Sequence, residues 1–133
     1  MNYENCTCNS TSQFIANRYG LGYQIPLGLV LLGGPLVDNG HQVILIDNDK
    51  KGLEEDKLAD ELMSFNPDCI MIGHTASTAA PLSALKTAVA LKEKFQRAVI
   101  VYGGVFPSYA SESILKDYSF IDIIVRGEER RLL

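Results

Sequence analysis

The chain has 133 residues, 47% hydrophobic and 21% charged, which suits one globular domain with its own core. Its net charge of -4 and its scattered basic residues give no electrostatic footprint for nucleic acid. The longest apolar run, residues 25–32, is too short to span a membrane, and nothing near Met1 resembles a signal peptide. We therefore expect a cytoplasmic protein that binds neither nucleic acid nor membrane.

The N-terminal segment, residues 1–25, is polar and is expected to be partly disordered. Residues 1–13 are rich in Asn, Thr, Ser and Cys, and nothing before Pro26 has the apolar run of a buried strand. Cys6 and Cys8 would need two further ligands at suitable spacing to bind a metal. Cys69 lies in an apolar run and is expected to be a small hydrophobic residue of the core. We predict free thiols in a reducing compartment and no metal ligand.

Residues 26–133 are predicted to form the folded domain, because short apolar runs alternate there with helical periods. This alternation is typical of βα units and a parallel sheet, whose strands are apolar nearly throughout when both faces are covered. The predicted strands are residues 42–47, 69–73, 98–103 and 121–126. The predicted helices are residues 27–39, 54–65, 81–95 and 111–116, with 128–133 as the start of a fifth.

Two of the helices carry more detailed expectations. In the third, Leu82, Leu85, Ala88 and Val89 are expected to share the apolar side. In the first, residues 33–35 (Gly-Gly-Pro) cost about 5 kcal/mol in helix propensity. That helix must therefore be kinked, shortened or held by packing. The two glycines either mark a bend in a buried segment or let the helix approach the sheet or a ligand closely, and we favour the bend.

A central strand is missing from this pattern. Doubly wound domains of the flavodoxin type have strand order 2-1-3-4-5, with the first strand in the middle. We therefore predict a three-layer α/β/α flavodoxin-like (Rossmann-like) open parallel sheet that lacks its first strand, in a fragment of a longer protein. The empty position would leave unpaired strand edges, which predicts either a homodimer or a substitute strand from the N-terminal tail.

Ligands of open parallel sheets bind beyond the carboxyl ends of the strands, so the loops there are candidate sites. Residues 74–80 begin with His74 and are rich in small hydroxyl side chains, which suits either a cradle for polar ligand groups or an N-cap from Ser77 or Thr78. His74 has no neighbouring partner that would complete a catalytic or metal set. Gly103 and Gly104 allow either close ligand approach or a tight turn.

Nucleotide-binding motifs are absent from the sequence. No G-x-G-x-x-G follows a strand and no G-x-x-x-x-G-K-[ST] occurs. Asp47 occupies the place of a ribose-binding acid, but without the glycine loop this position carries little weight.

An ordered series of segments resembles a known family. They are residues 26–29 (PLGL), 39–43 (NGHQV), 66–68 (NPD), 103–108 (GGVFPS) and 122–128 (DIIVRGE). Together, residues 25–130 resemble the cobalamin-binding N-terminal domain of radical-SAM proteins, in particular the group that includes anaerobic magnesium-protoporphyrin IX monomethyl ester oxidative cyclase. The resemblance implies a flavodoxin-like domain that holds cobalamin at its strand ends.

The resemblance also implies a set of cofactor-binding residues. They are His74, Thr75, Ser77, Gly103, Gly104, Phe106, Pro107, Ser108, Arg126, Gly127 and Glu128. In full-length relatives a radical-SAM domain follows, with three cysteines around a [4Fe-4S] cluster, so S-adenosylmethionine and the cluster are expected only in the missing part of a parent protein. The family's first strand and the D-x-H-x-x-G loop are not found here, so we expect cobalamin to bind without a histidine below cobalt.

The resulting hypothesis is a cobalamin-binding module that is not catalytic alone and whose partner is the radical-SAM domain of a cyclase or methyltransferase. The alternatives are a ligand-free flavodoxin-like regulatory or protein-interaction domain, and a nucleotide or flavin binder.

Overall fold

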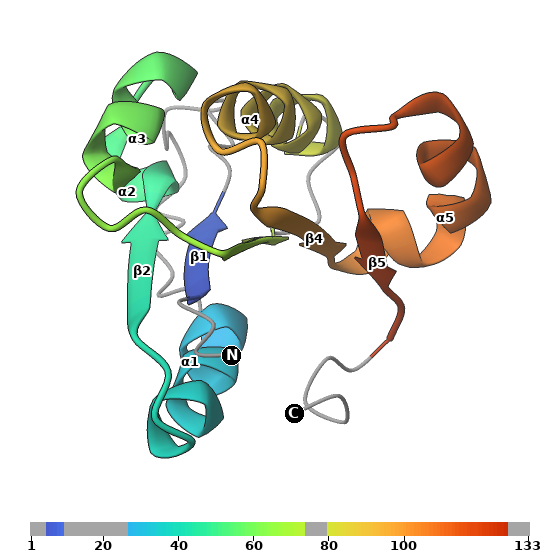
Figure 1. Cartoon of the computed structure of the whole chain (residues 1–133). Helices are drawn as coiled ribbons and strands as arrows, with labels where there is room; N and C mark the ends of the chain where they lie inside the picture. The colour runs from blue at the N-terminus through green and yellow to red at the C-terminus, as the bar shows by residue number, and fades with distance from the viewer. Residues whose placement is uncertain (1–4, 10–26, 74–79, 128–133) are drawn as a thin grey trace, which may run out of the picture.

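A computed structural model describes residues 5–9, 27–73 and 80–127, which form a parallel sheet flanked by helices (Figure 1). The strands are β1 (Asn5–Asn9), β2 (Val43–Asp47), β3 (Cys69–Gly73), β4 (Val99–Gly103) and β5 (Ile123–Val125). The helices are α1 (Leu27–Asp38), α2 (Asn48–Lys51), α3 (Glu55–Leu62), α4 (Ala80–Lys94) and α5 (Val105–Asp117). The order β2-β1-β3-β4-β5, parallel throughout, confirms the predicted flavodoxin-like α/β class.

The prediction that the first strand is lacking is wrong, because β1 occupies the centre of the sheet. Its middle residue, Thr7, pairs with Leu45 of β2 on one side and with Met71 of β3 on the other. The N-terminal tail thus supplies the central strand, as the second of the two predicted alternatives, a homodimer or a substitute strand, required. Strand pairing is made by backbone groups, and the suitability of a side chain depends on its surroundings. A polar segment can therefore form a central strand.

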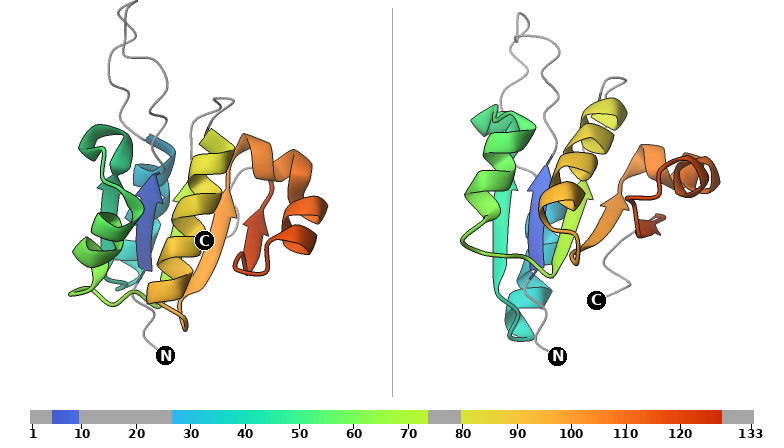
Figure 2. Two further views of the ribbon diagram at one scale, coloured as in Figure 1. Left: turned by 90° about the horizontal axis from the view of Figure 1, so that it is seen from above. Right: turned by 45° about the horizontal axis from the view of Figure 1, so that its top comes forward.

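One face of the sheet carries the main core, beneath α3 and α4 (Figure 2). Alternate residues of the paired strands point to this face, where Ile70 lies opposite Ile100 and Ile72 opposite Tyr102. All four are buried with α3 and α4 side chains, including Leu58, Leu62, Ala88 and Leu91. On the opposite face α1 buries Leu29, Leu32 and Leu36. This arrangement confirms the three layers.

Helix α1 runs without interruption through Pro35 to Asp38. Its buried leucines supply the packing that offsets its poor helix propensity. A Cβ on Gly33 would lie 3.7 Å from Val43 Cγ1, an ordinary contact distance, so the packing against β2 does not require glycine there. Gly40, with φ of 86°, follows the helix as predicted.

Helix α4 confirms the predicted positions of Leu85 and Ala88 but not of Leu82, which is 66% exposed. Ala84 and Leu91 are buried instead. The predicted fifth helix lies outside the described residues.

Two helical segments lie outside the predicted helices. Helix α5 is kinked at Ala110, so the predicted helix 111–116 matches its second part, and an additional helical segment begins at Val105. Pro107 lies in its first turn, where proline is tolerated because the N–H groups there have no helical acceptor. Helix α2 begins directly after β2, where the Asp47 carboxylate accepts a hydrogen bond from Lys50 N at 3.3 Å. Gly52, with φ of 62°, ends it.

Asp122 connects the start of β5 to β4 and α4. Its Oδ2 accepts hydrogen bonds from Ile100 N at 2.8 Å and from Lys92 Nζ at 2.7 Å, and Lys92 Nζ also donates to Ala98 O at 2.8 Å. Burial by itself would raise the pKa of Asp122, but the Ile100 hydrogen bond and the Lys92 ammonium outweigh it, and the pKa is lowered.

We expect Asp122→Asn to lower stability in a pH-dependent way. A carboxyl whose pKa is lowered by folding stabilises the protein above its ordinary pKa of about 4. That contribution is lost as the pH falls through the lowered folded-state value. Urea denaturation should therefore separate wild type from the variant at pH 7 and show a much smaller difference at pH values well below about 4. The control Asp117→Asn removes an exposed carboxylate outside this network. An equal difference at both pH values would contradict the prediction.

Candidate functional site

The carboxyl ends of the strands meet at one edge of the sheet. Asn9 at the end of β1 pairs with Asp47 and with Gly73, and Gly103 of β4 pairs with Val125 of β5. All five arrows point toward this edge, which we call the strand-end edge (Figure 2). It is where ligands of open parallel sheets bind.

The structure brings together the predicted site residues that follow β4 and β5. These residues are Gly103, Gly104, Phe106, Pro107, Ser108, Arg126 and Gly127. The remaining predicted site residues, His74, Thr75, Ser77 and Glu128, lie outside the described residues.

Gly104 turns the chain from β4 into α5. Its φ of 124° and ψ of -172° lie in a region that is essentially restricted to glycine. It occupies the N-cap position, where no side chain caps the helix. The first N–H groups of a helix have no intrahelical acceptor, so at α5 they can serve a polar or anionic group.

Ser108 joins the two turns by hydrogen bonds. Its hydroxyl donates to Gly104 O at 2.7 Å and accepts from Gly127 N at 3.1 Å. Its carbonyl oxygen accepts from Arg126 Nε at 3.2 Å. The turn after β4 and the turn after β5 therefore form one connected structure.

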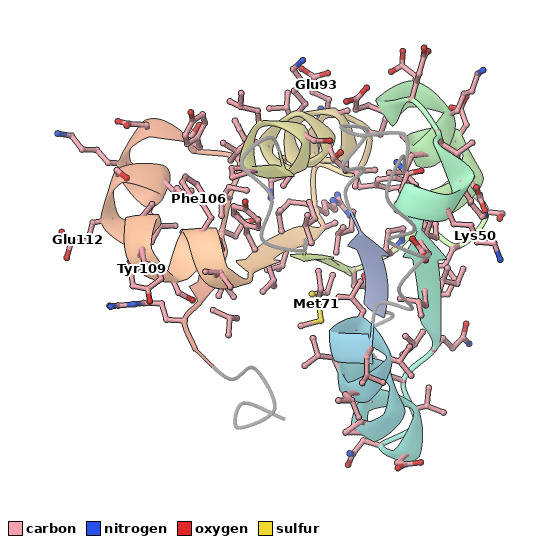
Figure 3. The ribbon with its side chains drawn as sticks, turned by 180° about the vertical axis from the view of Figure 1, so that it is seen from behind. Lys50, Met71, Glu93, Phe106, Tyr109 and Glu112 are labelled. Atoms are coloured by element: carbon pink, nitrogen blue, oxygen red, sulfur yellow. The ribbon has the colours of Figure 1, made fainter. Side chains whose placement is uncertain are left out.

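The first two turns of α5 present a mixed surface. The Pro107 side chain is fully buried, whereas Phe106 is 38% and Tyr109 is 90% exposed. Figure 3 shows Phe106, Tyr109 and Glu112 along this helix. Val105 is also exposed, so apolar side chains flank the glycine turn on its helical side.

The turn after β2 is fixed by Asn48, which the sequence analysis did not single out. Asn48 is 1% exposed; its Nδ2 donates to Leu53 O and its Oδ1 accepts from Leu53 N, both at 3.0 Å. An asparagine directly after a strand is a common turn signal and would have identified this position. At the end of β3, a Cβ on Gly73 would lie 3.3 Å from Leu29 Cδ2, so α1 packs closely there.

Tyr102, the residue before Gly103 in β4, is buried in the core beneath α3 and α4. Burial raises the pKa of the Tyr102 phenol, at the end of β4, and so keeps it neutral. Within residues 27–73 and 80–127, no group of three His, Cys, Asp or Glu side chains is arranged to hold a metal ion. No helix in the described part is long and apolar enough to cross a membrane.

Comparison with known proteins identifies relatives. An anaerobic magnesium-protoporphyrin IX monomethyl ester cyclase from Synechocystis is 41% identical over 103 residues, covering 77% of this chain and 21% of the relative. The enzyme of that name from Rubrivivax gelatinosus is 32% identical, covering 81% of this chain and 19% of the relative. The chain therefore spans about a fifth of the length of these relatives.

The fold is also found in a solved structure, that of the cobalamin-dependent S-adenosylmethionine radical enzyme OxsB with aqua-cobalamin and S-adenosylmethionine bound. The TM-score is 0.71 at 19% identity, covering 98% of this chain and 18% of OxsB. The sequence model of the B12 binding domain matches residues 16–133. The expected resemblance is confirmed, and the chain belongs to the B12-binding domain family.

Proposed function

We propose that this domain holds cobalamin at the strand-end edge, with the turns after β4 and β5 as part of the site. The observation that carries this proposal is the uncapped, glycine-initiated start of α5 beside the end of β5, in a member of the B12-binding family. The proposed contacts are those predicted from the sequence except the Ser108 hydroxyl, which is hydrogen-bonded within the protein. They include His74, Thr75, Ser77 and Glu128 from segments outside the described residues.

The chemistry of this edge fits the cofactor. Cobalamin combines a broad corrin ring, amide side chains and a phosphate in its nucleotide tail. Gly104, which precedes α5, carries no Cβ, and the first N–H groups of α5 are available for an amide oxygen or phosphate. The exposed Val105 and Phe106 side chains offer apolar surface nearby.

The role of the domain is to bind and orient. When bound, the cobalt of cobalamin can carry a methyl group or transfer electrons, and the protein's share is to hold and position the cofactor. We propose that the domain works in cis with a radical-SAM domain of a longer cyclase- or methyltransferase-type enzyme and is not catalytic alone. The cyclase names of the relatives and the radical chemistry of OxsB support this assignment.

We expect Gly104→Ala to weaken cobalamin binding about tenfold, because a Cβ there imposes backbone strain of about 1 to 3 kcal/mol at the proposed site. The matched control is Gly40→Ala. Gly40 also has positive φ, 86°, but precedes β2 at the opposite end of the sheet. Titration with hydroxocobalamin, followed by absorbance after desalting, measures the affinity.

Three outcomes decide between the candidate functions. Retention of cobalamin by wild type and by Gly40→Ala, with about tenfold weaker binding by Gly104→Ala, supports the proposal. If wild type retains no cobalamin, the ligand-free regulatory or protein-interaction alternative is favoured. Retention of FMN instead would favour a flavin binder.

A further inference from the structure

The Ser108 hydroxyl spans two segments that are distant in sequence. It donates to Gly104 O at 2.7 Å and accepts from Gly127 N at 3.1 Å, so its single proton is already committed within the protein. The Ser108 N–H also points to Gly104 O, at 3.3 Å. These contacts differ from those of a residue that presents its hydroxyl to a ligand.

We propose that Ser108 is a positioning residue that locks the turns after β4 and β5 into one preformed binding edge. The inference rests on the proposed function, because the edge it organises is the proposed cobalamin site. Gly104 and Gly127 both have positive φ, 124° and 77°. Glycine can adopt many other conformations as well, so a hydrogen bond is needed to hold each turn in this one. A preformed edge binds more tightly because less ordering is needed on binding.

Arg126 extends the same connection. Its Nε donates to Ser108 O at 3.2 Å, so the residue before Gly127 is held to α5 independently of the hydroxyl. A Cβ on Gly127 would meet no atom within 4 Å, so the space beside this turn is open. The serine connection thus orients an accessible backbone segment.

The test compares Ser108→Thr with Ser108→Val. These side chains have nearly the same shape, and only threonine keeps a hydroxyl that can bond to the carbonyl four residues earlier. The same pair at Ser113 is the control, because the Ser113 hydroxyl donates only a local bond, to Ala110 O at 2.9 Å, on the exposed side of the same helix. Hydroxocobalamin affinity and Gly127 amide hydrogen exchange are measured for all four variants.

We expect Ser108→Val to weaken hydroxocobalamin binding about three- to tenfold and to speed Gly127 amide exchange by a similar factor, as loss of one or two hydrogen bonds implies. Ser108→Thr should restore both, and the Ser113 variants should change neither. Equal affinities for Ser108→Thr and Ser108→Val would overturn the proposal. So would Gly127 exchange that does not depend on the hydroxyl.

The two readouts separate this inference from the proposed function. Amide exchange is measured without cofactor, so it tests the connection between the turns even if wild type retains no cobalamin. In that case the proposed function fails, and with it the role of Ser108 in binding, while hydroxyl-dependent exchange at Gly127 would still show the structural connection. If Ser108→Val does not fold, Ser108→Ala replaces it as the variant without a hydroxyl and is compared with Ser108→Thr.

Discussion

Thr7→Pro is expected to unfold the domain or to destabilise it strongly. Thr7 is the middle residue of β1, which pairs with β2 on one side and β3 on the other. In a central strand each N–H belongs to one of two hydrogen-bonded ladders, and proline has no N–H to donate. Because domains are stable by only about 5 to 15 kcal/mol, such a loss removes much or all of the margin.

The measurement is urea denaturation followed by circular dichroism. Thr7→Val is the control, because it keeps a β-branched residue and is expected to change stability by no more than about 1 kcal/mol. Native-like stability of Thr7→Pro would show that β1 does not hold the centre of the sheet.

Leu91→Ala is expected to lower the free energy of unfolding by about 2 to 5 kcal/mol. Leu91 lies in α4 with 0% exposure and belongs to the core beneath α3 and α4. Truncation removes buried methyl groups and leaves a cavity that close-packed neighbours fill only in part.

Leu82→Ala makes the same chemical change on the same helix, where the side chain is 66% exposed. Its effect should stay within about 0.5 kcal/mol. Thermal and urea unfolding of the two variants give the comparison directly. Equal losses would contradict the orientation of α4, and a small loss in Leu91→Ala would contradict the position of the core.

The sequence predicted the strands with two apolar faces and missed the strand without them. The runs that became β2, β3, β4 and β5 are apolar nearly throughout, which leaves a clear signal in composition even where Leu45 and Ile123 are 41% and 48% exposed. The segment Asn5–Asn9 has no such signal. Its place is set by backbone pairing with two partners far along the chain, and no local pattern records that pairing.

The site was predictable in outline for a different reason. Gly103 and Gly104 follow an apolar run, so a turn at a strand end could be expected from residue type alone. The start of α5 could not, because Pro107 is compatible with both a loop and a first helical turn. The hydrogen bond between Gly127 and Ser108 could not be predicted either, because it depends on how the turns after β4 and β5 meet in space.

The central place of β1 has a kinetic consequence. Its pairing partners are distant in sequence, as the contact of Asn5 with Cys69 illustrates, so closing the sheet requires ordering a long stretch of chain. During synthesis β1 emerges first but pairs on both sides only after β3 has been made. Until β1 has inserted between them, β2 and β3 expose backbone edges that other chains can pair with. Insertion of the N-terminal strand thus sets the interval during which the nascent domain is prone to aggregate.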